Sequence, residues 1–247
     1  MLVGGDKGTL IIDRIVVVGY AAGMPRIARV AGGGMVQHVL NRGNGRMKLF
    51  HKPQDYQAFV DLLGEALERV QGMRLLAWCL MPNHWHMALW PREDQDLSAF
   101  MRWLSNTHVR RWHQHWHSVG QGHIYQGRFK SFLVQDDLHY LTLLRYIESN
   151  PCRARLVEQA QAWPWSSLSI QSTSEGRSLV GQGPLDRPRK WLALVNEPLS
   201  EGIIEPIRAS VKRGRPYGDD QWVQRMVDRF GLAFTMRPRG RPRKEIC

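Results

Sequence analysis

Residues 74–90 read RLLAWCLMPNHWHMALW and are the most informative stretch of the chain. Two runs rich in apolar residues, Arg74–Leu80 and His84–Trp90, flank a short segment that contains Pro and Asn. Pro and Asn favour turns, and apolar runs of this length between turn residues are typical of strands. The stretch therefore predicts a β-hairpin.

The second strand of this hairpin begins with His84-Trp85-His86. Because side chains alternate between the two faces of a strand, His84 and His86 share one face. Trp85, Met87 and Leu89 share the opposite face, which we expect to be buried. Two neighbouring imidazoles can chelate one divalent ion. The alternative is a pair of edge histidines with no ligand role.

The chain on both sides of the hairpin alternates between strand-like and helix-like patterns. Apolar residues at three- and four-residue steps predict helices, and short apolar runs bounded by turn residues predict strands. These elements are a strand at Met35–Asn41, helices at 53–70 and 97–116, a strand at Arg128–Val134 and a helix from Asp136 or Asp137 to Ser149. Their order predicts an α+β fold, a ferredoxin-like antiparallel sheet with helices packed on it.

The chain divides into four predicted parts. They are an N-terminal extension (1–23), a main domain (24–170), a Ser- and Gly-rich linker (171–184) and a basic, mostly helical C-terminal extension (185–247). Met24 reads as an alternative start, so we expect residues 1–23 to lie outside the domain. Residues 156–170 are expected to pack back onto it.

The composition favours a nucleic-acid partner. The 247 residues include 34 Lys and Arg against 22 Asp and Glu, a formal net charge of +12. Such an excess favours a polyanion, although a merely basic protein is the alternative. An apolar fraction of 43% excludes wholesale disorder. Three scattered cysteines without a CxxC spacing exclude a disulfide framework and a zinc knuckle. No run approaches the ~18 apolar residues of a membrane helix.

A second candidate for chemistry is Tyr146 with Asn150 on the last helix of the predicted domain. Residues four apart lie on nearly the same helical face, one turn apart. An amide oxygen suits Mg²⁺ or Mn²⁺, and a phenol beside such an ion can attack a phosphate. The alternative is a packed tyrosine and a helix-terminal asparagine before Pro151.

Other tyrosines and histidines compete for these roles. Tyr140 falls on another helical face, and Tyr125 lies in a turn-like segment. His113 and His117 have an i,i+4 spacing that can bind a metal. That helix has no acidic partner beside them and carries arginines, so it favours a basic polar face instead.

The end of the chain is strongly basic. Residues 208–247 contain eleven Lys and Arg against four Asp and Glu, with helices expected at Pro206–Lys212 and Asp219–Phe230. Two Gly-Arg-Pro elements, which contain Arg213 with Arg215 and Arg239 with Arg241, resemble the Arg-rich hooks that enter the minor groove of duplex DNA. The alternative is a solvated basic tail.

Three motifs together carry a resemblance to a known family. They are Pro82-Asn83-His84-Trp85-His86, then Tyr125-Gln126-Gly127-Arg128-Phe129-Lys130, then Tyr146-Ile147-Glu148-Ser149-Asn150-Pro151. Their order and distances resemble the REP-associated tyrosine transposases, which are single-tyrosine transposases of the HUH endonuclease superfamily. The resemblance covers roughly residues 24–170, and the start Met24-Pro25-Arg26 also fits.

The resemblance implies an activity and a role for each matching residue. It implies metal-dependent cleavage and rejoining of single-stranded DNA at hairpin-forming repeated palindromes, with Mg²⁺ or Mn²⁺ as cofactor. His84 and His86 would be the metal pair, Asn150 would complete that site, and Tyr146 would be the nucleophile. Arg128 and Lys130 are candidates for phosphate contacts, with simple surface charge as the alternative. The implied location is the bacterial cytoplasm, with the nucleoid.

Two other classes of function compete with the transposase hypothesis. One is a non-catalytic DNA-binding regulator, in which the tail binds duplex DNA and the histidine pair has no role. The other is a metal hydrolase that acts on small phosphates. The expected partners are single-stranded DNA with hairpins and, through the tail, duplex DNA. The sequence leaves monomer and homodimer open.

Overall fold

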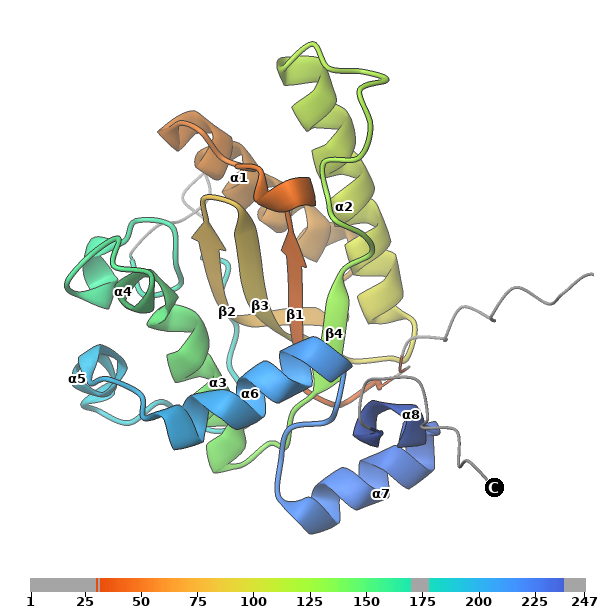
Figure 1. Ribbon diagram of the computed structural model, residues 1–247, viewed down its shortest axis with the longest axis vertical. Coiled ribbons are helices and arrows are strands. Elements are labelled where there is room, and N and C mark those ends of the chain that lie inside the picture. The colour runs from red at the N-terminus through yellow and green to blue at the C-terminus, as the bar shows by residue number, and fades with distance from the viewer. Residues whose placement is uncertain (1–29, 31, 170–177, 238–247) are drawn as a thin grey trace, which may run out of the picture.

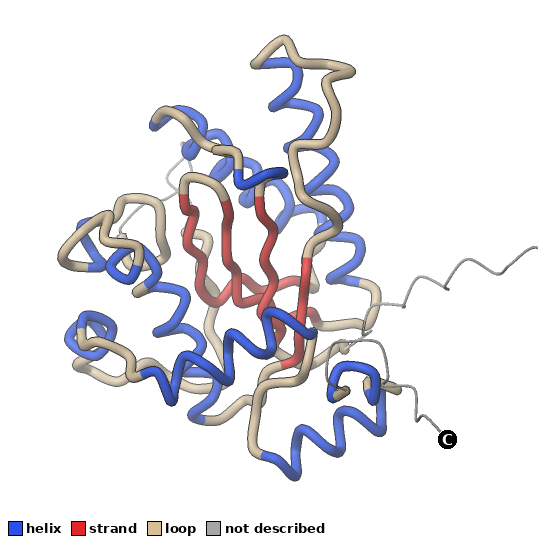
Figure 2. The backbone as a smooth tube through the Cα atoms, in the orientation of Figure 1, coloured by secondary structure: helices blue, strands red, loops and turns tan. Residues whose placement is uncertain are grey.

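The computed structural model describes residue 30 and residues 32–169 and 178–237. Its centre is a four-stranded sheet with the order β2-β3-β1-β4, in which neighbouring strands are antiparallel. The strands are β1 (Gln37–Arg42), β2 (Met73–Met81), β3 (His84–Pro91) and β4 (Lys130–Leu133). Helices pack around this sheet (Figure 1, Figure 2), so the predicted α+β fold is confirmed. The predicted extension at 1–23 lies outside the described residues.

β2 and β3 form the predicted hairpin. Met81 pairs with His84, so residues 82–83 make the connection. β1 pairs with the other side of β3 and places Arg42 directly opposite His84. β3 therefore has a neighbour on both sides, which fixes the face on which each of its side chains lies.

One face of the sheet packs against α1 (Pro53–Arg69) and α2 (Asp96–His115). Trp85, Met87 and Leu89 lie on this face and are fully buried. Their contact with the apolar sides of both helices removes large hydrophobic surfaces from water. The predicted burial of this side of β3 is confirmed.

The opposite face, which carries His84 and His86, is covered by α3 (Leu138–Glu148), α5 (Trp191–Asn196) and α6 (Glu201–Arg213). Apolar side chains of all three helices share one cluster with the sheet, namely Leu143, Leu144, Ile147, Trp191, Val195, Ile204, Ile207, Leu76 and Ala88. The first half of the C-terminal extension thus belongs to the same core as the sheet.

The helix that carries Tyr146 ends earlier than the sequence predicts. α3 stops at Glu148, and a short helix, α4 (Asn150–Arg153), begins directly after Ser149. Pro151 has no amide proton, so the bond it would make to a carbonyl one turn earlier is missing and the helix breaks. Asn150 is therefore the first residue of α4, and the expectation that it shares one continuous helix with Tyr146 is wrong.

The last strand of the sheet is shorter than the predicted Arg128–Val134. β4 starts at Lys130, which leaves Arg128 in the preceding loop. In that loop the Asn41 side-chain amide donates to the carbonyl of Gly127 at 3.3 Å. This side-chain bond takes the place of a backbone bond between β1 and the residue before Arg128. Arg128 is therefore in a loop, and the prediction that it lies on a strand is wrong.

The C-terminal extension differs from the sequence prediction at α6. α6 begins at Glu201, whereas the sequence predicted a helix at about Pro206–Lys212. Pro206 instead lies inside the helix. α6 ends at Arg213, where Gly214 adopts a left-handed conformation with φ of 75° that suits glycine.

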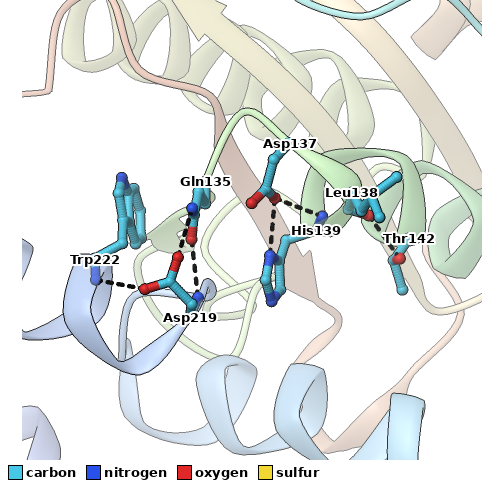
Figure 3. A network of polar contacts seen from close by, with 7 residues as sticks. All are labelled: Gln135, Asp137, Leu138, His139, Thr142, Asp219 and Trp222. Carbon is cyan, nitrogen blue, oxygen red and sulfur yellow. Dashed lines mark hydrogen bonds and ion pairs between the residues drawn. The ribbon is translucent and has the colours of Figure 1, made fainter.

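The last described helices are joined to the sheet edge by a polar network (Figure 3). Asp219 caps α7 (Asp220–Phe230) by accepting from the Trp222 amide, and its own backbone amide and carboxylate both bond the Gln135 side chain at 2.8 Å. Tyr217 continues the contact as a bridge to Val134, next to β4. A short helix, α8 (Ala233–Met236), follows.

Two segments lie along the outer edge of β2. The Leu80 amide donates to the Trp165 carbonyl, and the Gly181 amide donates to the Leu75 carbonyl, both at 2.8 Å. The predicted return of the segment after residue 156 onto the domain is confirmed, and the described end of the predicted linker also packs there, with Leu179 buried. Both segments cover backbone groups that an open edge would expose. None of the helices formed by the described residues is long and apolar enough to cross a membrane.

Candidate active site

The site lies on the face of the sheet that α3 covers. His84 and His86 project from β3 with their ring centroids 5.1 Å apart and their planes nearly perpendicular. His86 is buried at 4% exposure, and His84 is partly buried. The structure thus places the two histidines side by side, as the alternation of the strand predicts.

Tyr146 faces these histidines from α3. Its ring centroid lies 6.0 Å from that of His86, with the planes perpendicular. The two competing tyrosines lie elsewhere. Tyr125 is on the opposite face of the sheet, where its hydroxyl bonds Trp85, and Tyr140 packs near Gly183. The sheet imidazoles and the helix phenol therefore lie together, as the sequence predicts.

The position of α3, and with it Tyr146, is held by a buried carboxylate. Glu148 is fully buried and accepts hydrogen bonds from Ser167 at 2.6 Å and from Arg187 and Trp191 at 2.7 Å. Burial raises the pKa of Glu148, and the nearby Arg187 guanidinium lowers it. The bonds from Arg187 and Trp191 attach the C-terminal extension to α3, so the extension helps to orient Tyr146.

A third histidine, which the sequence reasoning missed, completes the cluster. His38 on β1 is fully buried, and its Nε2 lies 2.9 Å from Nδ1 of His86 with the two rings stacked at 5.0 Å. Its backbone pairs with Ala88, two residues from His86 on the same face. Only the register of β1 against β3 reveals this contact, and the sequence alone does not fix that register.

All three imidazoles are neutral at physiological pH. Burial, reinforced by the Arg153 charge, lowers the pKa of His38 to about 3. Burial and the charges of Arg42 and Arg153 lower the pKa of His84 to about 4. The pKa of His86 is well below its ordinary value, first because of burial and then because of the neighbouring His38 and His84 and the charges of Arg153 and Arg42. Neutral imidazole is the form that binds metals.

Hydrogen bonds on Nδ1 restrict the tautomers of both predicted metal ligands. His84 Nδ1 lies 2.7 Å from the Asn83 side-chain oxygen, which can only accept, so His84 carries its proton on Nδ1. Its Nε2 lone pair is then free. One proton is shared between His86 Nδ1 and His38 Nε2, and when it resides on His86 the Nε2 of His86 is free as well. This arrangement is typical of metal-binding histidines.

Asn150 contributes an unsatisfied amide. It is 8% exposed, and its Nδ2 is buried without a hydrogen-bond partner among the described residues. Half a turn about the last side-chain bond exchanges the amide nitrogen and oxygen. With its oxygen in the place of that unpartnered nitrogen, the Asn150 amide would join two neutral imidazoles as a ligand type that a divalent ion accepts. The residues present therefore fit the expected metal.

No group of three or more His, Cys, Asp or Glu side chains within the described part of the chain is arranged to hold a metal ion. The predicted set has only two such side chains, with an amide as the third. The competing pair at the end of α2 is engaged locally, since His113 Nδ1 lies 2.9 Å from the Ser118 hydroxyl.

Two arginines also border the site, and the sequence reasoning missed both. The Arg153 guanidinium lies over the Tyr146 ring, 4.0 Å from its centroid. Its Nη1 donates to the Tyr146 carbonyl at 2.7 Å and to the Ser149 hydroxyl at 2.6 Å. Arg42 lies opposite His84, and its Nε is buried without a partner in the part of the chain described.

The predicted phosphate contacts of the main domain occupy different places. Lys130 pairs with Leu40, which also pairs with His86, so the exposed Lys130 lies on the histidine face two strands away, about 10 Å along the sheet. Arg128 is exposed in the loop before β4 and lines a hollow of about 530 Å³ with Asn41 and Tyr125.

The predicted tail contacts lie away from the histidines or outside the described residues. Arg213, at the end of α6, donates to the Arg237 carbonyl at 3.2 Å. Arg215 pairs with Asp220 at 3.6 Å. Arg239 and Arg241 lie outside the described residues.

Comparisons with known proteins match the site-bearing part of the chain. Residues 34–150 match the model of the family described as Transposase IS200 like. We call residues 34–150 the IS200-like segment. It contains β1 to β4, α1 to α3, the three clustered histidines and Tyr146, and its last residue is Asn150.

Two known proteins are similar to the chain. A putative REP-associated tyrosine transposase of Haemophilus influenzae is 27% identical over 101 residues, which cover 38% of this chain and 57% of the relative. The chain thus matches little more than half the length of this curated relative. A solved structure of a REP-associated tyrosine transposase bound to a REP hairpin shares 22% identity, with a TM-score of 0.49 over 65% of this chain and 92% of the other. With the family match, the curated relative confirms the resemblance that the sequence motifs carry.

Proposed function

We propose that the protein is a metal-dependent transposase that cleaves and rejoins single-stranded DNA through a covalent bond to Tyr146. The observation that carries the proposal is the position of the Tyr146 ring, 6.0 Å from His86 within the IS200-like segment. A phenol beside neutral imidazoles on a basic protein matches the needs of phosphoryl transfer. The relation to a REP-associated tyrosine transposase supports the same class of reaction.

In the proposed reaction the Tyr146 oxygen bonds to phosphorus as the bond from phosphorus to the 3′ oxygen breaks. The phenol proton goes to solvent, and the departing 3′ oxygen takes one from solvent. The products are a 5′-phosphotyrosine and a free 3′ hydroxyl. One phosphoester replaces another, so a second 3′ hydroxyl can reverse the step and rejoin the strand without ATP.

His84, His86 and Asn150 are the residues that would hold Mg²⁺ or Mn²⁺. A bound ion neutralises charge on the phosphate and polarises it towards attack. The protein prepares this site in two ways. It keeps the imidazoles neutral by burial, and Asn83 holds the His84 ring in the tautomer with a free Nε2.

The proposed substrate is single-stranded DNA next to a hairpin of a repeated palindrome. Lys130 on the histidine face and Arg128, beside the hollow that Asn41, Tyr125 and α2 line, are proposed to contact its phosphates. We propose that Arg213, Arg215, Arg239 and Arg241 contact duplex DNA, in keeping with the net charge of +12. This function would locate the protein with the chromosome in the bacterial cytoplasm.

Covalent trapping tests the proposal. The probe is a set of end-labelled single-stranded oligonucleotides that carry the repeated palindromes of the chromosome encoding the protein, incubated with Mn²⁺. We expect a labelled protein band that survives SDS in the wild type and is absent from Tyr146→Phe. Tyr140→Phe is the matched control, because Tyr140 is a buried tyrosine of the same helix that lies away from the histidines.

Each other outcome has a defined meaning. An adduct that persists in Tyr146→Phe contradicts the assigned nucleophile. A shift in the mobility of the oligonucleotide without any adduct in the wild type favours the DNA-binding regulator. Turnover of small phosphodiesters by Tyr146→Phe favours the hydrolase, since that reaction uses water in place of the phenol.

A further inference from the structure

Two guanidinium groups face the histidine cluster without a carboxylate to balance them. They belong to Arg42 at the end of β1 and Arg153 at the end of α4. Within the described residues, no ion pair joins either group to an Asp or Glu. Other arginines near this face are paired. Arg208 bonds Glu201 and Glu205, and Arg187 bonds the buried Glu148.

Arg153 is fixed in place by the site itself. Its Nη1 makes two hydrogen bonds to the backbone and side chain around Tyr146, and its plane lies over the phenol ring. A guanidinium has five N–H donors, and the two Nη1 bonds together with the contact to the Tyr146 side chain do not use all of them, so donors remain for a ligand. Burial lowers the pKa of Arg153 because it destabilises the charged guanidinium. A bound anion would stabilise that charge.

Arg42 approaches the same histidines from the sheet. Its backbone pairs directly with His84, and residues directly opposite on antiparallel strands have side chains on the same face. The buried Nε of Arg42 has no hydrogen-bond partner in the described part of the chain. An unpaired buried donor on a cation is costly unless an acceptor arrives.

These features point to one class of ligand. Two cations beside neutral imidazoles repel a divalent ion unless an anion lies among them. Arg side chains bind phosphate oxygens with paired, charge-assisted hydrogen bonds. The ligand that fits is therefore a phosphodiester held by the two arginines and placed next to the Tyr146 hydroxyl.

We propose that Arg42 and Arg153 bind the non-bridging oxygens of the phosphate that Tyr146 attacks. This assignment rests on the proposed function and makes both arginines catalytic residues of that reaction. Arg153, which contacts both the phenol ring and the helix end, also aligns Tyr146 with the phosphate. In this arrangement the charge that grows on the phosphate during transfer is stabilised by groups already in position.

A neutral phosphate tests the charge contact directly. The cleavage position is first mapped from the wild-type adduct. In a Tyr146→Phe background, which cannot form the covalent bond, affinity is then measured for two hairpin oligonucleotides. One has a normal phosphodiester at that position, and the other has an uncharged methylphosphonate. We expect the methylphosphonate to bind about 10-fold to 100-fold more weakly, as for the loss of a charged hydrogen bond.

The arginine variants give the specific result. Arg42→Gln or Arg153→Lys is then added to Tyr146→Phe. In each double variant the ratio of the affinity for the phosphodiester oligonucleotide to that for the methylphosphonate oligonucleotide should fall. For Arg42→Gln it should fall towards one. Arg102→Gln, an exposed arginine of α2 behind the opposite face of the sheet, should leave the ratio unchanged. Arg153→Lys can disturb the helix end that Nη1 supports, so thermal unfolding is recorded for each variant, and Arg42→Gln tests the site independently.

The outcomes separate this inference from the proposed function. A wild type that forms no adduct overturns both. A wild-type adduct together with an unchanged ratio in Arg42→Gln and in a folded Arg153→Lys overturns the phosphate site alone. A reduced ratio in either variant, with the Arg102→Gln control unchanged, supports it.

Discussion

The two faces of β3 carry similar side chains in opposite states. On the face under α1 and α2, the Tyr125 hydroxyl accepts from Trp85 Nε1 at 3.0 Å and lies 2.7 Å from His108 Nδ1, so the polar atoms of this trio are paired. On the face under α3, buried polar atoms of His38, Arg42 and Asn150 have no partner among the described residues. Gln37 and Ser105 on the α1/α2 side also carry unpartnered buried atoms. The orphaned atoms of His38 and Arg42 differ because they lie beside the histidine pair, where they indicate a place for a ligand.

The histidines provide the largest expected contrast between the faces. His84→Ala or His86→Ala should lower the rate of single-turnover DNA cleavage by about 10³-fold, because the metal contributes several kcal/mol to the transition state. Hairpin affinity should stay within about three-fold, since imidazoles are not the phosphate contacts. His108→Gln is the matched control on the other face and should cleave normally. Equal losses in His86→Ala and His108→Gln would show that the loss reflects folding and not a metal site.

Removing a tyrosine hydroxyl should destabilise the protein more on the face under α1 and α2, at Tyr125, than on the face under α3, at Tyr146. Tyr125→Phe leaves Trp85 Nε1 and His108 Nδ1 unpaired, which should lower the free energy of unfolding by about 1–3 kcal/mol. Tyr146→Phe should change it by less than about 1 kcal/mol, because the Arg153 guanidinium that contacts the Tyr146 side chain keeps its bonds to the Tyr146 carbonyl and the Ser149 hydroxyl. Urea denaturation measures both. A larger loss in Tyr146→Phe would give that hydroxyl a structural role.

Acid should weaken both faces through their buried histidines. The pKa values of His38 and His108 are about 3 and that of His84 is about 4, all lowered chiefly by burial from an ordinary 6.5. Below pH 6.5 these histidines take up protons in the unfolded chain but stay neutral in the folded chain. The free energy of unfolding is therefore highest above pH 6.5 and falls as the pH drops towards 4. Each histidine contributes about 1.4 kcal/mol per pH unit in this window.

Replacing one histidine checks this account. His108→Gln should make the free energy of unfolding less dependent on pH between 6.5 and 4, even if its value at neutral pH is lower. Urea denaturation at a series of pH values gives the slope. An unchanged slope would mean that His108 is protonated in the folded protein.

The tail should have the smallest effect, confined to binding. Arg239→Gln with Arg241→Gln should weaken DNA affinity and reduce the slope of log affinity against log salt by about 0.9 for each lost phosphate contact. The same slope is measured for Lys130→Gln, which removes one proposed phosphate contact from the histidine face of the sheet. Deletion from residue 208 is a poor test, since it cuts α6 and removes α7. An unchanged slope in the double variant would mean that the tail does not bind DNA.

The sequence predicts those parts of the molecule that local patterns determine. The turn residues 82–83 and the alternation along His84–Trp90 define the hairpin and the two faces of β3, and the structure agrees. Pro151 ends the helix that carries Tyr146 almost where the sequence predicts, but Asn150 begins α4 and does not continue α3. Local patterns failed at Pro206, which lies inside α6 and not at the start of the predicted helix Pro206–Lys212.

The rest of the site depends on contacts between distant segments. His38 and Arg42 reach the histidine pair only through the register of β1 on β3. Arg153 contacts Tyr146 from the other side of the junction between α3 and α4. Neither the register nor this contact is encoded in a motif, so three of the charged or polar groups around Tyr146 were not predicted.

The identity of the residue that bonds to DNA tests the central claim most directly. The adduct formed with a hairpin oligonucleotide is digested with nuclease and protease, and the nucleotide-bearing peptide is sequenced by mass spectrometry. The account predicts a 5′-phosphate nucleotide on Tyr146. A nucleotide attached to any other residue, or cleavage that leaves no protein-bound nucleotide, would contradict it.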